Sequence, residues 1–194
     1  KTSNIINSYY FIEENQEKIT KEQVLWLARW SKEKQPELFV DMVSRLDQPN
    51  VTFVMAGDPK NETTYKELAN TASKLNIKIP GKISYKEVNS YFSKALIFVN
   101  TSYREGVSNT FIEAMLNGVP VLSLNSNPNN WLTDYNIGYC ANGDLEKLTI
   151  QLNSLLKDRT TLETMSTNAK TFAKEQFSND SIIESYIKLF QQNA

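Results

Sequence analysis

Two cationic side chains, Arg29 and Lys34, lie five positions apart on one short polar segment. The compact apolar run over 24–28 precedes this segment and is typical of a buried strand, so both cations belong to the loop after that strand. Arginine offers a planar fork of N–H donors and lysine a mobile point charge, and together they can hold a diphosphate. Taken alone, the loop fits a solvated basic turn better, because lysine and arginine are common on protein surfaces.

Two carboxylates, Glu105 and Glu113, flank the start of a helix that the apolar spacing predicts over 110–116. Ser108 or Asn109 can cap this helix, and its first N–H groups and its dipole would form an anion site. We expect the dipole to keep Glu113 ionised, so that it can accept two hydrogen bonds from a ribose diol. Glu105 precedes the turn and can accept hydrogen bonds from a second sugar. Spacing alone is weak support, since a glutamate at a helix start is often only a partner of the dipole.

The elements that must position these residues alternate between short apolar runs and amphipathic helices. Helices are predicted from Pro36 onward and over 64–75, 86–94 and 110–116. The predicted strands cover 24–28, 51–56, 77–81, 96–100, 119–124 and, more weakly, 137–141. This alternation predicts an α/β fold, an open, doubly wound parallel sheet with helices on both faces. Such sheets bind ligands at the carboxyl ends of their strands, where the loops described above lie.

The two ends of the chain have a different pattern. Apolar residues at helical spacing predict three consecutive helices over 145–156, 162–173 and 182–190, a helical C-terminal tail with no strand between its members. Residues 1–22 have weak periodicity and are interpreted as an incoming linker or edge segment. The pattern begins as if in the middle of a longer protein, and Lys1 is not an initiator methionine.

Composition excludes several classes of function. The 194 residues include 21 basic and 22 acidic side chains, a balance that argues against a nucleic-acid binder. The absence of histidine excludes a histidine-dependent triad and a histidine-ligated metal, and one cysteine excludes a disulfide framework or a cysteine zinc cluster. No stretch of about 18 apolar residues is present, and the N-terminal 15 residues lack a signal-peptide core. The cytoplasm is therefore the expected compartment.

The segment from Thr101 to Val121 resembles the donor-binding half of GT-B glycosyltransferases, in particular the retaining family 4. That family's pattern runs roughly Pro-Ser-x-x-Glu-Gly-x-x-x-x-x-x-Glu-Ala-x-x-x-Gly-x-Pro-Val. The residues that match it in register are Ser102, Glu105, Gly106, Glu113, Ala114, Gly118, Pro120 and Val121. An upstream Gly-Arg-x-x-x-x-Lys signature is matched by Arg29 and Lys34, with Ala28 in place of glycine. The resemblance implies that residues 23–194 form one Rossmann-like nucleotide-sugar-binding domain.

The resemblance also implies a role for each matching residue. Arg29 and Lys34 would hold the donor diphosphate, and Glu105 would contact the transferred sugar; these three are the catalytic candidates. Glu113 would hold the ribose hydroxyls. The other donor-binding candidates are Gly57, Lys82, Ile83, Gly106, Ser108, Asn109 and Thr110, of which Lys82 and Ile83 would receive the nucleobase and Asn109 and Thr110 would assist at the phosphate. No metal or other cofactor is expected, because Arg29, Lys34 and the helix dipole would neutralise the leaving diphosphate.

Several positions depart from the family pattern. Ala28 replaces the usual glycine and is followed by the bulky Trp30, so the first loop is expected to approach the phosphates differently. Ser108 replaces a common glycine. The segment 125–130 is rich in asparagine where Gly-Gly is usual, which leaves the sugar open.

The implied partners extend beyond this chain. The donor is expected to be a UDP-sugar, with GDP-mannose next, and the acceptor a glycan or a lipid-linked glycan. An N-terminal acceptor domain, absent from this sequence, would supply the other wall of the cleft and any membrane contact at the inner face. The donor half alone would be inactive.

Two other classes of function are alternatives. The first is a non-catalytic nucleotide-binding or scaffold domain with a decayed site. The second, a flavodoxin-like domain, lacks support because no Gly-rich phosphate loop follows the first strand.

Overall fold

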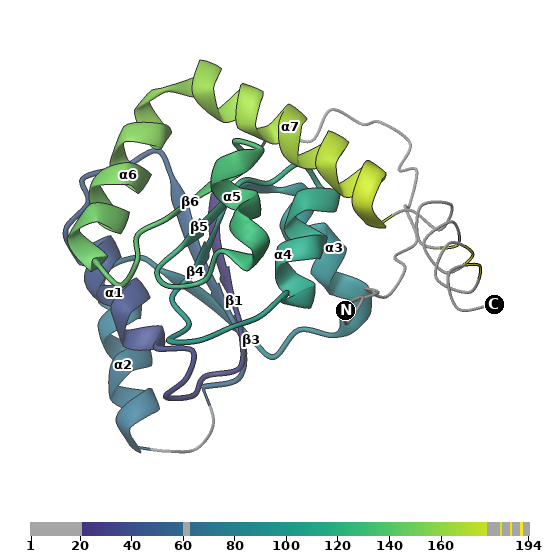
Figure 1. The fold of residues 1–194 in the computed structure, drawn as a ribbon. Helices are drawn as coiled ribbons and strands as arrows, with labels where there is room; N and C mark the ends of the chain where they lie inside the picture. The colour runs from purple at the N-terminus through teal and green to yellow at the C-terminus, as the bar shows by residue number, and fades with distance from the viewer. Residues whose placement is uncertain (1–20, 60–62, 178–182, 184–186, 188–190, 192–194) are drawn as a thin grey trace.

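The computed structural model describes residues 21–59, 63–177, 183, 187 and 191, and it contains one six-stranded parallel sheet (Figure 1). The strands are β1 (Gln23–Leu27), β2 (Thr52–Ala56), β3 (Lys78–Gly81), β4 (Ala95–Asn100), β5 (Val121–Ser123) and β6 (Gly138–Cys140). Their order across the sheet is β3-β2-β1-β4-β5-β6. The predicted doubly wound parallel sheet is confirmed, and all six predicted strands are present with ends shifted by at most two residues.

Helices cover both faces of this sheet. On one face lie α1 (Pro36–Ser44), α2 (Thr63–Lys74) and α6 (Leu145–Lys157), and on the other α3 (Tyr85–Ser93) and α4 (Asn109–Leu116) (Figure 1). The long helix α7 (Arg159–Phe177) contributes to both layers, because Leu162 and Met165 pack with the first and Phe172 and Phe177 with the second. None of the helices within the described ranges combines the length and the apolar character needed to span a bilayer.

Side-chain alternation along the strands fills both layers. Successive residues of a strand point to opposite faces. Val24 and Trp26 accordingly pack under α1, whereas Leu25 between them packs with the second layer. In β4 every residue is buried, as expected for a central strand that is covered on both sides. The near-continuous apolar runs in the sequence therefore correspond to central strands of a parallel sheet.

The segment 125–136 contains short helical structure that the apolar pattern of the sequence does not predict. A 3-10 turn over Pro128–Asn130 leads into the short helix α5 (Trp131–Asp134). Asn129 and Asn130 adopt left-handed conformations, with φ values of 48° and 58°, which asparagine tolerates better than most residues. The Asn127 side chain accepts a hydrogen bond from the backbone N–H of Leu132 at 3.0 Å. This hydrogen bond satisfies one backbone N–H in the first turn of α5, whereas Asn130 at the N-cap position makes no side-chain cap.

The ends of the chain are described only in part. The predicted linker over 1–22 lies outside the described residues except for Lys21 and Glu22, and the predicted helix over 182–190 lies outside them except for Ile183 and Ile187. Lys21 donates hydrogen bonds to the carbonyls of Asn117 at 2.8 Å and Gly118 at 2.9 Å. A cation at the C-terminus of α4 complements the helix dipole and fixes that end of the helix.

Candidate functional site

The strand order places β1 and β4 side by side at the centre of the sheet. From β1 the chain moves outward through β2 to β3, and from β4 it moves the other way through β5 to β6. The carboxyl ends of two such strands form a topological switch point, where open α/β sheets bind their ligands. The loops that follow these strands meet there, since the Tyr103 N–H donates to the Glu33 carbonyl at 2.8 Å.

Lys34 and Glu105 are in direct contact at this switch point. The Lys34 ammonium Nζ lies 2.7 Å from the carboxylate Oε1 of Glu105, and the two side chains are 27% and 15% exposed. Two of the three predicted catalytic residues, which lie 71 positions apart in the sequence, are thus brought together by the pairing of β1 with β4. The third, Arg29, is exposed on the first of these loops.

Arg29 also influences the loop's acidic residue. Glu33 is exposed, and its pKa is lowered first by a hydrogen bond from Ser31 and further by the positive charges of Arg29 and Lys34. A carboxylate between two cations reduces their mutual repulsion, and an incoming diphosphate would serve the same purpose. In the sequence, Arg29 and Lys34 therefore lie on either side of Glu33, whose negative charge partly balances theirs.

The second oxygen of Glu105 has protein donors of its own. Its Oε2 accepts hydrogen bonds from Asn100 Nδ2 and from Ser102 Oγ, both at 2.8 Å. Burial alone would raise the pKa of Glu105, but the hydrogen bonds from Lys34, Asn100 and Ser102 outweigh it and hold that pKa below its usual value. Glu105 is therefore ionised at neutral pH.

Glu113 has a different environment on α4. Its half-buried carboxylate makes no hydrogen bond or ion pair with any residue that the structure describes. Burial raises its pKa to about 7. The expectation that the helix dipole keeps it ionised is wrong, because α4 begins at Asn109 and Glu113 lies past the first turn, where the dipole no longer compensates for lost hydration. A carboxylate without donors is suited to a ligand that brings hydroxyl groups.

The start of α4 carries three of the predicted donor-binding residues. Ser108 occupies the N-cap position, as predicted, but its side chain does not cap the helix. Its Oγ instead lies 2.7 Å from Oγ1 of Thr110. The first turn of the helix therefore lacks a side-chain acceptor at the N-cap. Asn109 is exposed, and Gly106 is also exposed, with open space where a side chain would be.

Gly57 connects the ends of three strands. Its φ is +143°, and a Cβ at this position would lie 1.9 Å from the carbonyl oxygen of Ala28. Its N–H donates to the carbonyl of Gly81 at 2.9 Å. Only glycine permits this close approach of β1 and β2. The next two residues after Gly81 are the exposed Lys82 and the half-buried Ile83, which packs against the second layer.

Trp30 does not obstruct the first loop. Its side chain is fully buried and makes edge-to-face contacts with Trp26 at 6.3 Å and Tyr65 at 5.9 Å between ring centroids. The ring points into the core and leaves Arg29 exposed. How the loop approaches a phosphate stays a prediction.

The sequence analysis missed Asn100 and the part played by Thr101. Thr101 is fully buried, accepts a hydrogen bond from Trp26 Nε1 at 2.9 Å and lies 2.7 Å from the carbonyl oxygen of Lys34, to which it donates. Asn100 is the last residue of β4 and was counted as part of an apolar strand. An amide and a hydroxyl at the end of such a strand are the signal that could have revealed them, since asparagine is depleted in strands.

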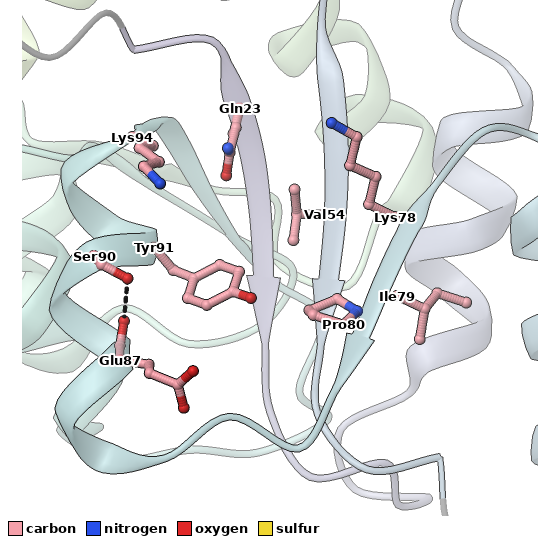
Figure 2. Close-up of a pocket in the computed structure, with 9 residues that line it drawn as sticks. All are labelled: Gln23, Val54, Lys78, Ile79, Pro80, Glu87, Ser90, Tyr91 and Lys94. Carbon is pink, nitrogen blue, oxygen red and sulfur yellow. Dashed lines mark hydrogen bonds between the residues drawn. The ribbon is translucent and has the colours of Figure 1, made fainter.

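A groove elsewhere on the molecule contains none of these residues. Figure 2 shows it between α3 and the sheet face formed by the first three strands, with a volume of about 460 Å³. Its lining includes Gln23 at the start of β1 and Lys94 just before β4, so it extends toward the amino ends of these strands. The groove is therefore distinct from the switch point.

The sequence matches the family of glycosyl transferases group 1 over residues 11–172. One curated relative is the 2-deoxystreptamine N-acetyl-D-glucosaminyltransferase of Niallia circulans, 31% identical over 113 residues, which is 57% of this chain and 29% of the relative. The matched part thus spans less than a third of that relative's length.

Solved structures show the same fold. Anabaena HepE in complex with UDP has a TM-score of 0.76 at 22% identity, covering 89% of this chain and 49% of that chain. A variant of S. aureus TarM in complex with fondaparinux, alpha-GlcNAc-glycerol and UDP has a TM-score of 0.75 at 21% identity, covering 97% of this chain and 40% of that chain. This chain spans about half of the length of these two proteins or less. Its architecture is that of the Rossmann-like sheet in these structures, and the chain belongs to the family of glycosyl transferases group 1.

Proposed function

We propose that this chain is the donor-binding domain of a retaining, family 4-like glycosyltransferase that transfers a sugar from a nucleotide diphosphate sugar. The observation that carries the proposal is the Lys34–Glu105 ion pair at the carboxyl ends of β1 and β4. It places a cation suited to a diphosphate next to a carboxylate suited to sugar hydroxyls, at the position where this kind of sheet binds ligands.

The donor lies along the carboxyl edge in an order that the strands support. From one side to the centre, the edge carries Lys82 and Ile83 after β3, Gly57 after β2, and Arg29 after β1. In the proposed arrangement the nucleobase contacts the backbone at Lys82 and Ile83, and the diphosphate reaches Arg29 and Lys34. Gly57 has a backbone role, because it allows the loops on either side to approach one another.

The α4 side of the site receives the ribose and part of the diphosphate. The carboxylate of Glu113, which has no partner among the described residues, accepts the ribose hydroxyls, and these supply donors that offset the cost of its burial. The open first turn of α4, at Ser108, Asn109 and Thr110, assists at a phosphate oxygen. Gly106 leaves room for the sugar beside Glu105.

A UDP-sugar is the proposed donor, with GDP-mannose as the second candidate. Anabaena HepE in complex with UDP shares this fold, and the Niallia circulans relative is named as an N-acetylglucosaminyltransferase. The acceptor is proposed to be a glycan or a lipid-linked glycan bound by a separate N-terminal domain, on the cytoplasmic side of a membrane. We propose that the reaction needs no metal, since Arg29, Lys34 and the α4 dipole can neutralise the leaving diphosphate.

A titration of this chain with UDP, GDP and ADP, followed by protein-observed NMR, tests the donor proposal. We expect saturable shifts with UDP at the loops after β1, β3 and β4. Glu113→Ala and Arg29→Ala should each weaken UDP binding by roughly tenfold, because each removes charge-assisted hydrogen bonds. Glu67→Ala is the matched control, since Glu67 is also the fifth residue of its helix and is exposed. Equal binding of UDP by all variants would contradict the proposed site.

Transfer activity separates the enzyme from a non-catalytic nucleotide-binding domain. The protein that carries this chain would be assayed with UDP-glucose and UDP-N-acetylglucosamine, as the unmodified protein and as Glu113→Ala. A fall in rate for the variant is expected. An unchanged rate would indicate a decayed site and favour the scaffold alternative.

A further inference from the structure

Three consecutive residues at the end of β4, Asn100, Thr101 and Ser102, are buried and polar, with exposed fractions of 5%, 0% and 1%. Buried polar side chains destabilise a fold unless their hydrogen bonds are satisfied. A buried polar cluster at the end of a central apolar strand therefore indicates that its side chains have specific hydrogen-bond partners. Its partners are the two residues of the central ion pair, Lys34 and Glu105.

Thr101 fixes the loop that carries Lys34. Its hydroxyl lies 2.7 Å from the carbonyl oxygen of Lys34 and 3.0 Å from that of Gln35, and it accepts the indole N–H of Trp26. The hydroxyl therefore has both a donor and acceptors to satisfy it. Because Gln35 has a left-handed backbone, with a φ of 46°, the chain turns sharply here, and Thr101 anchors the inside of that turn.

Asn100 and Ser102 fix the carboxylate of Glu105. The backbone N–H of Ser102 donates to Asn100 Oδ1 at 3.1 Å, which orients the amide so that Nδ2 points to Glu105. The same Nδ2 lies 3.1 Å from Ser102 Oγ, and Ser102 Oγ in turn donates to Glu105 Oε2. The three side chains form a closed network in which the orientation of each group is determined by its neighbours.

We propose that Asn100, Thr101 and Ser102 are positioning residues that fix Lys34 and Glu105 relative to one another before a donor binds. The inference rests on the proposed function, which assigns Lys34 to the diphosphate and Glu105 to the sugar. A lysine ammonium has three N–H donors, and the structure uses one of them on Glu105. The other two can reach phosphate oxygens, so one ammonium can bridge the diphosphate and the sugar-side carboxylate.

The neighbouring strand provides a matched control. Ser123, the last residue of β5, pairs in register with Asn100, is fully buried and accepts a hydrogen bond from the Ser126 N–H at 2.9 Å. It has the same kind of place in the sheet and a buried hydroxyl, but it bonds to neither Lys34 nor Glu105. A role limited to ending a strand would affect Ser123→Ala and Ser102→Ala alike.

The first experiment measures the pKa of Glu105 by carbon-detected NMR on the chain labelled at glutamate, with Glu105→Gln to assign the signal. Ser102→Ala and Asn100→Ala should each raise this pKa by about one unit, because each removes a donor to the ionised form. Ser123→Ala should leave it unchanged. Ser102→Ala removes a single oxygen and serves where Asn100→Ala fails to fold. An unchanged pKa of Glu105 in a folded Ser102→Ala protein would overturn the proposal.

The second experiment connects positioning to transfer and uses the protein that carries this chain, with UDP and UDP-glucose as probes. Thr101→Val and Ser102→Ala should reduce kcat with UDP-glucose by roughly tenfold while UDP affinity changes less than about twofold, because the network acts on the reacting groups. The acid limb of the pH–rate profile should move to higher pH in Ser102→Ala and should stay in place in Thr101→Val. Failure of the unmodified protein to bind UDP would refute the proposed function, whereas the NMR measurement would still decide the positioning network. Loss of UDP binding in the variants alone would contradict the positioning proposal.

Discussion

Glu105 and Glu113 belong to one motif, yet their surroundings differ in nearly every respect. Glu105 accepts three hydrogen bonds, one of them from a lysine, and its pKa is lowered in spite of burial. The half-buried carboxylate of Glu113 makes no hydrogen bond or ion pair with the described residues, and its pKa is raised to about 7. The protein holds the Glu105 carboxylate in place with hydrogen bonds. The Glu113 carboxylate has acceptor positions that a ligand can fill.

This difference separates two ways of building a binding site. A carboxylate that is satisfied by its own chain keeps its orientation and charge whether or not a ligand is present, which is the condition for preorganised electrostatics. A buried carboxylate without donors gains most from a ligand that supplies hydroxyl hydrogens. In the proposed site the sugar-side group is therefore fixed in advance, whereas the ribose-side group contributes binding energy only when the donor arrives.

The largest expected effect comes from removing a partner of Glu105, the carboxylate whose hydrogen bonds come from the protein itself. Lys34→Ala removes the cation that pairs with Glu105 among the described residues, and one of the two proposed diphosphate ligands. We expect the rate of transfer to fall roughly a hundredfold, the loss typical of removing one group that stabilises developing negative charge. The measurement is the initial rate with UDP-glucose or UDP-N-acetylglucosamine in the protein that carries this chain.

Lys32→Ala is the control for this change. Lys32 lies on the same loop and is exposed, and it has no part in the proposed site. The variant removes the same charge from the loop without touching the ion pair. If both substitutions lower the rate equally, the general charge of the loop, and not the contact with Glu105, would account for the effect.

The sequence analysis predicted the sheet well because its signals are local. The run over 96–100 reads as a central strand from its apolar residues alone, and β4 is buried throughout. The contact of Lys34 with Glu105 was not predicted as such. It depends on β1 lying beside β4, which follows from the strand order and not from any spacing in the sequence.

Burial was the quantity that the sequence analysis could not supply. The position of Glu113 near a helix start suggested a favourable dipole, but its pKa depends on how much water the packed layer removes. Asn100 was overlooked because it continues an apolar run and lies five positions from the residue that it holds. Both errors concern the environment of a side chain, whereas the elements that carry these side chains were correctly predicted.

The pH dependence of UDP binding sharpens the comparison. Since the pKa of Glu113 is about 7, this carboxylate is protonated on the acid side and then loses its capacity to accept two hydrogen bonds from the ribose diol. Protonation of this carboxylate between about pH 8 and about pH 6 should therefore weaken UDP binding by up to roughly tenfold, the limit for one group whose pKa is about 7. Calorimetric titration at several pH values measures the effect.

Glu113→Gln should remove the part of this pH dependence that Glu113 contributes, because the amide does not titrate. The terminal phosphate of UDP takes up a proton near about pH 6 and contributes equally with both proteins. Glu67→Gln, at the corresponding place on α2, should retain the Glu113 contribution. Glu105 gives no contribution in this range, since its lowered pKa keeps it ionised throughout. A pH dependence as large in Glu113→Gln as in the unmodified protein would assign the titration to another group and remove the proposed role of Glu113 in holding the ribose.

The smallest effects, and the ones independent of any ligand, are on stability. Folding lowers the pKa of Glu105, so its ionised form stabilises the fold above the ordinary pKa of a glutamate, and this contribution is lost as the pH falls through the lowered value. Folding raises the pKa of Glu113, so stability is greatest below the ordinary value and is lost as the pH rises through about 7. The same substitution should therefore have opposite signs at the two positions.

At about pH 8, Glu105→Gln should lower the free energy of unfolding by about 1–2 kcal/mol, because the hydrogen bonds to an ionised acceptor are weakened. Glu113→Gln should raise it by about 0.5 kcal/mol, a small value because the carboxylate keeps part of its hydration. Urea unfolding of both variants and of Glu67→Gln, at about pH 8 and again at about pH 5, gives the comparison directly. Destabilisation by Glu113→Gln at the higher pH would show that Glu113 has donors within its own chain, and the distinction between a carboxylate held by the protein and one left for the ribose would be lost.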